Sequence, residues 1–211
     1  MGISILMPIR NGWEFLPESM ESIVNQTYRD WEIIIGINGI ESEEIKDKIR
    51  KYANDSTTIL NFYNIKSKAH VLNKMLKYCD NKYIAILDVD DKWDLKKLEI
   101  QMHYIDKYDV VGTGCKYFGE KNHHPDIPYG ELNNFDVNPV INSSVLMRKE
   151  CCKWNEDFIA LEDYELWIRL AKEGKKFFNI NETLTFHRIH SGSYFNTKNQ
   201  SEWLDKIKKM C

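Results

Sequence analysis

Segments of strand character alternate with segments of helical character four times in the first half of the chain, and no other sequence feature constrains the fold as much. Short apolar runs predict strands at residues 3–7, 31–37, 57–63 and 83–87. Apolar side chains at helical spacing predict helices at residues 16–24, 45–53, 69–79 and 95–105. Strands joined in this way make right-handed crossovers and pair in parallel, so helices cover both faces of the sheet. The sequence therefore predicts an α/β fold with a mostly parallel central sheet.

The second half of the chain is less regular. Strands are predicted at residues 109–113, 140–148, 177–180 and 184–187, and helices at residues 161–171 and 201–210. Between them, residues 116–138 are polar and contain Pro125 and Pro128, which predicts a long surface excursion. Loops of this length are often functional.

Length and charge narrow the class of protein. A chain of 211 residues is the size of one domain, so we expect residues 1–211 to fold as a single unit. The formal net charge of −3 gives no global basic field, and we expect no nucleic-acid partner. No apolar run approaches the ~20 residues that cross a bilayer, so no transmembrane segment is predicted.

The five cysteines are odd in number and show no Cys-x-x-Cys spacing. This pattern argues against a disulfide framework or a zinc ribbon and favours a reducing compartment, so we predict a cytoplasmic protein. The sequence stops at Cys211 after a charged, helix-like tail, and we expect it to belong to a longer polypeptide with further domains.

Three carboxylates follow the predicted strand at residues 83–87, namely Asp88, Asp90 and Asp91. Ligands of open α/β sheets bind beyond the carboxyl ends of strands. Crowded carboxylates repel one another unless a cation is present, and Mg²⁺ or Mn²⁺ typically joins one or two carboxylates to substrate phosphates. The alternative is a solvated acidic turn that caps the helix beginning near Asp94.

Two other acidic motifs fail when they are tested against the same residues. An EF-hand loop from Asp88 to Glu99 would place Trp93 where a glycine is obligatory. A phosphatase that forms an aspartyl-phosphate would carry its paired aspartates after the first strand, followed by threonine, whereas here Lys92 follows the fourth strand's acids.

Four segments, in order and at matching spacing, resemble glycosyltransferase family 2 over about residues 3–190. They are Ser4–Asn11 (SILMPIRN), Glu21–Ile35 (ESIVNQTYRDWEIII), Tyr83–Asp91 (YIAILDVDD) and Glu162–Leu170 (EDYELWIRL). The small size also resembles a compact glycosyltransferase domain of a large algal virus, which would place the protein in the host cytoplasm.

The resemblance implies a GT-A fold, which is the Rossmann-like fold of nucleotide-diphospho-sugar transferases. It also implies a nucleotide-sugar donor, Mn²⁺ or Mg²⁺ as cofactor, and inversion at the anomeric carbon. Residues 1–113 would form the nucleotide-binding half. Residues 114–211 would form the acceptor-binding half and a C-terminal helix.

The resemblance assigns the donor site to matching positions. Pro8, Ile9 and Arg10 would hold the nucleoside in the turn after the first strand. Asn38 stands where the family usually has an aspartate that contacts the base or ribose, and its amide can hydrogen-bond a uracil edge. Leu72 replaces a common arginine, so Lys66 or Lys68 would supply that positive charge.

The acids after the fourth strand match further donor and metal positions. Asp88 and Asp90 match acids that face the ribose and the sugar, and Asp91, with Asp90, matches the metal ligands. His190 would be another metal ligand and Arg188 would hold a phosphate oxygen, although a loop histidine can simply be exposed.

Asp163 matches the general base of the family, and Glu162 would contact the acceptor or orient the site. The alternative is structural, because both acids open a predicted helix, where the dipole favours carboxylates.

Three functions remain open from the sequence. The first is metal-dependent, inverting transfer of a hexose-type sugar from a UDP-sugar, similar to UDP-glucose, to a hydroxyl of a glycan or glycoprotein acceptor. The second is a nucleotidyltransferase that makes sugar nucleotides. Such enzymes need a glycine-rich loop after the first strand, and Gly12 is the single glycine in residues 8–12. The third is a non-catalytic nucleotide- or sugar-binding module, which would not need Asp90, Asp91 and Asp163 together.

Overall fold

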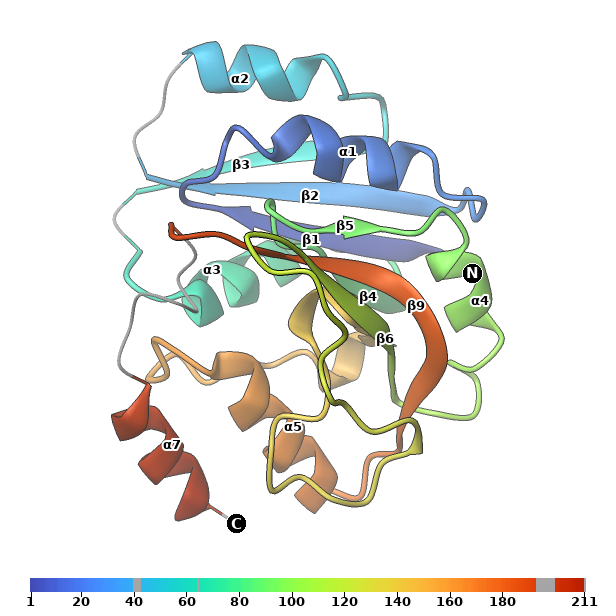
Figure 1. The fold of residues 1–211 in the computed structure, drawn as a ribbon. Helices are drawn as coiled ribbons and strands as arrows, with labels where there is room; N and C mark the ends of the chain where they lie inside the picture. The colour runs from blue at the N-terminus through green and yellow to red at the C-terminus, as the bar shows by residue number, and fades with distance from the viewer. Residues whose placement is uncertain (40–42, 64, 193–199, 211) are drawn as a thin grey trace.

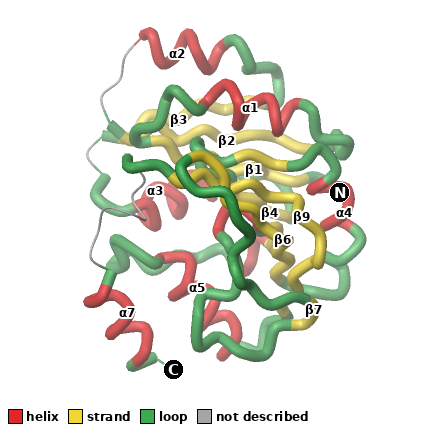
Figure 2. The backbone as a smooth tube through the Cα atoms, viewed as in Figure 1, coloured by secondary structure: helices red, strands yellow, loops and turns green. Residues whose placement is uncertain are grey.

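The computed structural model of the protein describes residues 1–39, 43–63, 65–192 and 200–210, with the backbone alone for residues 43–46. Within these ranges, nine strands form one sheet in the order β3-β2-β1-β4-β8-β6-β9-β5, and β7 pairs with β9 beside it (Figures 1 and 2). The strands are β1 (Ile3–Ile9), β2 (Trp31–Asn38), β3 (Thr57–Phe62), β4 (Tyr83–Ile86), β5 (Lys92–Trp93), β6 (Val110–Gly119), β7 (Gly130–Glu131), β8 (Leu146–Arg148) and β9 (Phe177–Ile189).

The helices lie on both faces of this sheet (Figure 1). They are α1 (Leu16–Val24), α2 (Glu43–Arg50), α3 (Lys68–Met75), α4 (Lys97–Met102), α5 (Glu162–Lys172) and α7 (Ser201–Lys208), with 3₁₀ turns η1 (Leu76–Tyr78), η2 (Asn142–Ser144) and η3 (Lys149–Cys151). No helix in the described ranges has both the length and the apolar character that crossing a bilayer requires.

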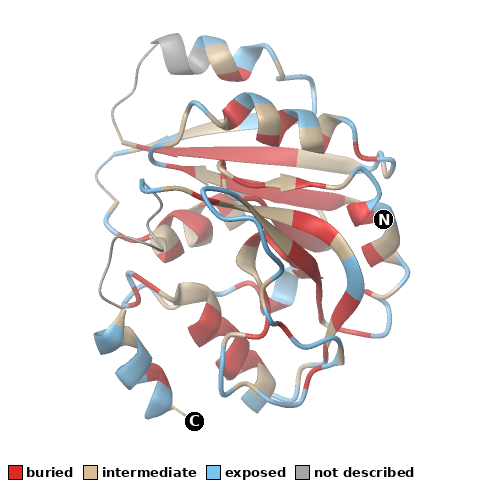
Figure 3. Cartoon of the chain, in the orientation of Figure 1, coloured by how far each residue is buried: buried red, intermediate tan, exposed pale blue. Residues whose placement is uncertain are grey.

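The alternation of side chains along β1 divides the core into two layers. Ile5 and Met7 are fully buried with the α1 residues Leu16 and Met20. Leu6 points the other way and is buried in a second cluster that contains residues of α3 and α5. Figure 3 shows the result, a buried sheet with exposed residues on the outer sides of the helices. A strand buried on both faces needs a continuous apolar run, which is what the sequence supplies.

The strand order places a switch point at β1, because both β2 and β4 pair with it in parallel. β3 extends the parallel part beyond β2, whereas β8 pairs with β4 in the antiparallel direction. The carboxyl ends of β1, β2 and β4 therefore meet at one edge of the sheet, which is where ligands of open α/β sheets bind. The predicted α/β fold with a mostly parallel sheet is confirmed.

The structure corrects three predicted elements in the second half. The strand predicted at residues 140–148 is instead η2 followed by the short strand β8. The two strands predicted at residues 177–180 and 184–187 are one strand, β9, which continues through an irregularity in its pairing with β6. A side chain at Gly114 would come within 2.6 Å of the Glu182 carbonyl, so glycine permits this close approach. The excursion at residues 116–138 begins as the end of β6 and contains β7.

The four cysteines that the structure describes are free and buried. They are Cys79, Cys115, Cys151 and Cys152. Cys211 lies outside the described residues.

Candidate active site

A cavity of about 1440 Å³ opens at the carboxyl ends of β1, β2 and β4. The predicted site residues that line it are Pro8, Ile9, Arg10, Asn38, Lys66, Lys68, Asp88, Asp90, Glu162, Asp163 and His190. Asp91 and Arg188 are absent from this lining. The fold thus gathers most of the predicted residues around one space, although they are spread over some 180 positions of the chain.

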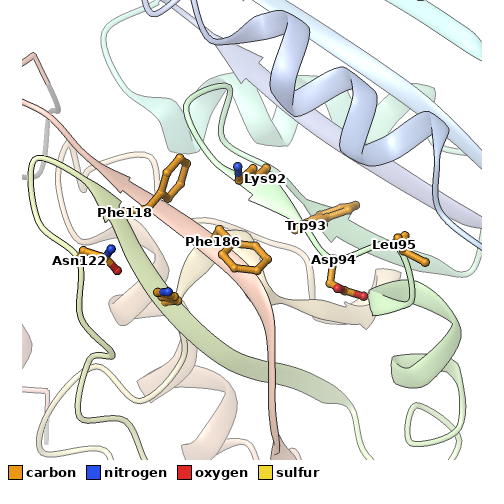
Figure 4. Close-up of a pocket in the computed structure, with 8 residues that line it drawn as sticks. Lys92, Trp93, Asp94, Leu95, Phe118, Asn122 and Phe186 are labelled. Carbon is orange, nitrogen blue, oxygen red and sulfur yellow. The ribbon is translucent and has the colours of Figure 1, made fainter.

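A second, smaller pocket of about 420 Å³ lies between β5 and the strands β6 and β9 (Figure 4). Its lining is mainly aromatic and basic, and Asp94 is its only acidic residue. The Lys92 ammonium lies 4.8 Å from the centre of the Phe118 ring and forms an ion pair with Glu18. The described residues that line this pocket include no pair of carboxylates, whereas those of the larger cavity do, so the larger cavity is the candidate active site.

Asp91 lies behind the cavity. Its side chain is fully buried, and Oδ2 lies 3.0 Å from His187 Nδ1 while Oδ1 accepts a 2.8 Å hydrogen bond from the Arg188 backbone N–H. Burial opposes its ionisation, but His187 and hydrogen bonds from Ser143 and Arg188 outweigh burial and lower the pKa of the Asp91 carboxyl. The expected role of Asp91 as the direct metal ligand does not fit this arrangement, because both oxygens already have protein partners and Asp91 is not among the residues that line the cavity.

Asp90 is the acid of this pair that lines the cavity, next to His190. Oδ2 of Asp90 lies 3.0 Å from Nε2 of His190. Burial and the neighbouring charges of Asp91 and Asp88 raise the pKa of Asp90 to about 6. This is a site where a cation would relieve repulsion between carboxylates.

The donor set of Asp90 and His190 fits a divalent cation such as Mn²⁺, which accepts both carboxylate oxygen and imidazole nitrogen. Among the described residues, no group of three or more histidine, cysteine or acidic side chains is gathered closely enough to hold a metal alone. A cation here would therefore need additional ligands from water or a donor diphosphate, which is the usual arrangement for Mg²⁺ at phosphate sites.

Asn38 lines the cavity, and its side-chain amide forms two hydrogen bonds with the backbone of Ile65. Its Nδ2 donates to the Ile65 carbonyl at 2.7 Å, and its Oδ1 accepts from the Ile65 N–H at 3.1 Å. This pair of bonds joins the end of β2 to the segment that carries Lys66 and Lys68. Asn38 therefore supports the lysine-bearing loop, and its expected contact with a base stays a prediction.

Lys68 joins the two halves of the site. Its ammonium lies 2.5 Å from Asp88 Oδ1 and 3.9 Å from Glu162 Oε1. Burial would favour the neutral amine, but the charges of Asp88 and Glu162 outweigh it and raise the pKa of Lys68. Asn142 donates to the other oxygen of Asp88 at 3.3 Å. Lys66 is exposed at the cavity edge.

Glu162 and Asp163 begin α5 and face the cavity. Burial raises the pKa of Glu162 to about 7 and also raises the pKa of Asp163. The preceding residue, Leu161, has φ = 57°, and it is the only described non-glycine residue with a positive φ. Such a conformation is costly for leucine, and strained residues cluster at functional sites. A carboxyl with a raised pKa in a cavity is a candidate general base.

Arg188 is not among the residues that line the cavity, where its expected role on a donor phosphate would need it. Its guanidinium lies between two rings, 4.4 Å from the centre of Phe15 and 4.2 Å from that of Phe118. Its Nε donates to the Asp90 carbonyl at 2.9 Å, and the terminal nitrogen pairs with Glu18. All of its charge is thus committed to holding the Asp88–Asp91 turn against α1.

The turn after β1 lies where the sequence predicts it. Pro8, Ile9 and Arg10 line the cavity, and Arg10 is exposed with no hydrogen bond or ion pair to a described residue. Gly12 has φ = 81°, a conformation that glycine adopts without strain, and this turns the chain toward α1. Arg10, like Lys66, is therefore well placed to meet an anionic ligand.

Several lining residues were not predicted, and Asn138 is the clearest case. Its Nδ2 donates to Asp163 Oδ2 at 3.1 Å. Tyr117 and Ile127 also reach the cavity from β6 and from the polar excursion. Nothing in the local sequence pattern marks these residues, because the excursion has no periodicity. The only signal was the unusual length of the loop itself.

The chain resembles enzymes that transfer sugars. The sequence profile described as Glycosyl transferase family 2 matches residues 4–160. The protein is 29% identical over 199 residues to WfaP of Escherichia coli, a UDP-Glc:alpha-D-GlcNAc-diphosphoundecaprenol beta-1,3-glucosyltransferase, with 90% of this chain and 78% of that protein covered. It is also 29% identical over 208 residues to the putative glycosyltransferase EpsE of Bacillus subtilis, covering 91% and 74%.

Solved structures show the same fold. TarS residues 1–349 from S. aureus, in complex with UDP-GlcNAc, superpose with a TM-score of 0.82 at 14% identity, covering 100% of this chain and 65% of that one. The mannosyltransferase PcManGT from Pyrobaculum calidifontis, in complex with GDP-Man and Mn2+, gives 0.70 at 13% identity, covering 91% and 58%. The chain thus spans less than two thirds of these structures, and the GT-A fold expected from the sequence is confirmed. Because the profile covers most of the chain, the protein is a glycosyltransferase that belongs to glycosyl transferase family 2.

Proposed function

We propose that the protein transfers a hexose-type sugar from a UDP-sugar, similar to UDP-glucose, to a hydroxyl of a glycan acceptor, with a divalent metal and with inversion. The relatives support the donor: WfaP and WfgD of Escherichia coli are both described as using UDP-Glc. TarS structures contain UDP and UDP-GlcNAc. The PcManGT complex with GDP-Man is the reason to test guanosine donors as well.

One observation carries the proposal. The same cavity is lined by Asp88, Asp90 and His190 and also by Asp163 at the start of α5. Sugar transfer needs stabilisation of a departing diphosphate and removal of a proton from the acceptor hydroxyl. The first group of side chains suits the diphosphate end, and Asp163 suits the proton.

Different residues of the cavity would bind the donor and remove the proton of the acceptor. A cation bound at Asp90 and His190 would act as a Lewis acid toward the diphosphate. Arg10 and Lys66 supply positive charge at the cavity edge, and Lys68 holds Asp88 for the ribose. Asp163 accepts the proton of the acceptor hydroxyl as its oxygen attacks the anomeric carbon, while the bond from that carbon to the diphosphate breaks. A single displacement of this kind inverts the configuration.

Binding and turnover test the proposal separately. Thermal shifts with UDP-glucose, UDP-GlcNAc and GDP-mannose, with and without Mn²⁺, should show stabilisation by a UDP-sugar that depends on the metal. Asp163→Asn should keep donor binding and lower kcat by about 10²–10⁴-fold, the usual contribution of a general base. Asp157→Asn, an exposed acid on the preceding loop, is the matched control. A near-normal kcat for Asp163→Asn would contradict the assignment of the base.

The finer expectations stay predictions. They are the division at residue 113, the cytoplasmic location, the viral origin, the glycoprotein alternative for the acceptor and the presence of further domains. The relatives named above are bacterial or archaeal. Because the chain spans only part of them, the activity of the full protein is itself a proposal.

A further inference from the structure

A loop that lies far from the acidic motifs in sequence reaches the candidate general base. Asn138 lines the cavity, and its amide nitrogen donates to Asp163 Oδ2 at 3.1 Å. The Oδ1 atom of Asn138 accepts a 3.4 Å bond from the Val140 backbone N–H, which orients the amide with its nitrogen toward the acid. An amide N–H donor stabilises the carboxylate and fixes its rotation.

The loop around Asn138 is tied to the helix that carries Asp163. The Tyr164 hydroxyl donates to the Phe135 carbonyl at 2.7 Å, and Trp167 Nε1 donates to the Val140 carbonyl at 3.3 Å. Both side chains are buried and belong to α5. The loop and the start of α5 therefore form one connected unit, with the bond between Asn138 and Asp163 between the two ties.

The buried side-chain amide of Asn179 joins the two ends of the loop at residues 128–139. Nδ2 of Asn179, a fully buried residue on β9, donates to the carbonyls of Pro128 and Pro139, each at 2.8 Å. These two carbonyls mark the ends of the segment between residues 128 and 139, and Pro139 directly follows Asn138. The Asn179 side chain thus sets the position from which Asn138 reaches into the cavity.

We call the two hydrogen bonds from Asn179 to Pro128 and Pro139 the Asn179 clamp. An asparagine at this buried position also destabilises the fold. Oδ1 of Asn179 is buried without a hydrogen-bond partner in the described structure. It also lies 2.1 Å from where a Cβ on Gly112, its neighbour on β6, would stand. An unpaired buried amide oxygen is destabilising, and an apolar side chain would avoid that cost. The two carbonyl bonds account for an asparagine at this position.

We propose that Asn138 is a positioning residue for Asp163, and that Asn179 holds Asn138 in place by closing the loop of residues 128–139. The inference rests on the proposed role of Asp163 as general base. The charged and titratable groups that act on Asp163 are Lys68 from α3, Asp88 from the turn after β4 and Glu162 from α5.

Asn138→Ala tests the first half of the inference. We expect kcat to fall about ten- to a hundredfold, the effect of losing a hydrogen bond to a charged group, while the Kd of the UDP-sugar stays unchanged. The hydrogen bond from Asn138 lowers the pKa of Asp163. Its loss should therefore move the acidic limb of the kcat–pH profile to higher pH. Asn138→Asp should move this limb further, because a second carboxylate repels the first.

Asn179→Leu tests the clamp. It should lower kcat in the same direction as Asn138→Ala, and it should increase amide hydrogen exchange over residues 129–138 without changing exchange in β1. Asn133→Ala, an exposed asparagine of the same loop, is the control and should match the unchanged protein. If Asn179→Leu does not fold, Asn179→Ala, which also removes both bonds to the proline carbonyls, tests the second half with the same readouts, while Asn138→Ala and Asn138→Asp decide the first half.

The outcomes separate this inference from the proposed function. If Asp163→Asn retains transfer, the proposed base is wrong and the inference fails with it. If Asp163→Asn is inactive while Asn138→Ala keeps the original kcat and pH profile, only the inference is overturned.

Discussion

His187, which lines the cavity, pairs with the fully buried Asp91, with 3.0 Å between Nδ1 of the imidazole and Oδ2 of the carboxylate. The two residues come from β9 and from the turn after β4, which are far apart in sequence. The pair, together with the Arg188 N–H on the second oxygen, anchors that turn. As a result, Asp90 is the residue that the turn presents to the cavity, next to His190.

The two neighbouring aspartates should respond differently to loss of charge. Asp90→Asn should abolish the Mn²⁺-dependent thermal shift with UDP-sugar and leave the stability of the unliganded protein unchanged or higher, because it removes a repelling charge. Asp91→Asn should lower the free energy of unfolding by about 3 kcal/mol, because the partly buried His187 loses its counter-charge. Urea titrations and thermal shifts on both variants separate these effects. A stable Asp91→Asn protein that has lost only its metal response would contradict this account.

The ion pair between His187 and Asp91 also predicts that the stability of the protein depends on pH. Burial disfavours the charged imidazole, but Asp91, Asp90 and Asp88 outweigh burial and raise the pKa of His187 to about 9. The folded state then binds more protons than the unfolded state, so this contribution is complete below pH 6.5 and is lost as the pH rises to about 9. The loss amounts to at most about 3 kcal/mol.

His187→Gln isolates that contribution from other titrating groups. In urea unfolding at pH 6.5, 7.5 and 9, the stability difference between the unchanged protein and His187→Gln should shrink as the pH rises. His103→Gln, at an exposed position on the surface, should show a constant difference. A difference for His187→Gln that stays constant over this range would show that the pair is not charged.

The two arginines predicted for the donor should separate into a binding residue and a structural one. Arg10 is exposed at the cavity, so Arg10→Ala should raise the Kd for UDP-sugar about tenfold and leave Tm unchanged. Arg188 lies between Phe15 and Phe118, so Arg188→Lys should lower the free energy of unfolding by about 1–2 kcal/mol, because lysine cannot reproduce the stacked, branched donor. Calorimetry of binding and thermal melts measure the two effects. Equal losses of affinity in the two variants would refute the distinction.

The buried Lys97 predicts a pH dependence of stability opposite to that of His187. Lys97 is fully buried, with its amine 2.8 Å from Gln101 Oε1 and 4.1 Å from the centre of the Trp93 ring. Burial lowers the pKa of Lys97 well below its usual value, so the unfolded state binds the extra proton and stability rises with pH.

Lys97→Met removes this titration. The stability of Lys97→Met relative to the unchanged protein should be greater at pH 6 than at pH 9, measured by urea unfolding. Lys96→Met, one residue earlier and exposed, should show no such trend. The opposite trend for Lys97→Met would mean that the amine is charged in the folded state.

The sequence alone predicted the other four strands and the four helices of the first half, although not β5 at Lys92–Trp93, and it predicted the edge of the sheet at which the candidate site lies. Apolar runs such as that of residues 31–37 specify buried strands through local periodicity, and acids that directly follow a strand must lie at its carboxyl end. These relations depend on neighbours along the chain, so they can be read without a structure.

Only the tertiary structure decided how individual side chains are used. Asp90 and Asp91 are adjacent in sequence, yet the pairing of β5 and β9 turns one toward the cavity and the other toward His187. Arg188 was predicted to hold a phosphate, and Asn138 was not predicted as a site residue. Both errors have the same cause, because the partners of these residues, Glu18 and Asp163, lie on other elements of the chain. A charged or amide side chain takes whichever partner packing brings within about 3 Å, and that choice is made between elements rather than within them.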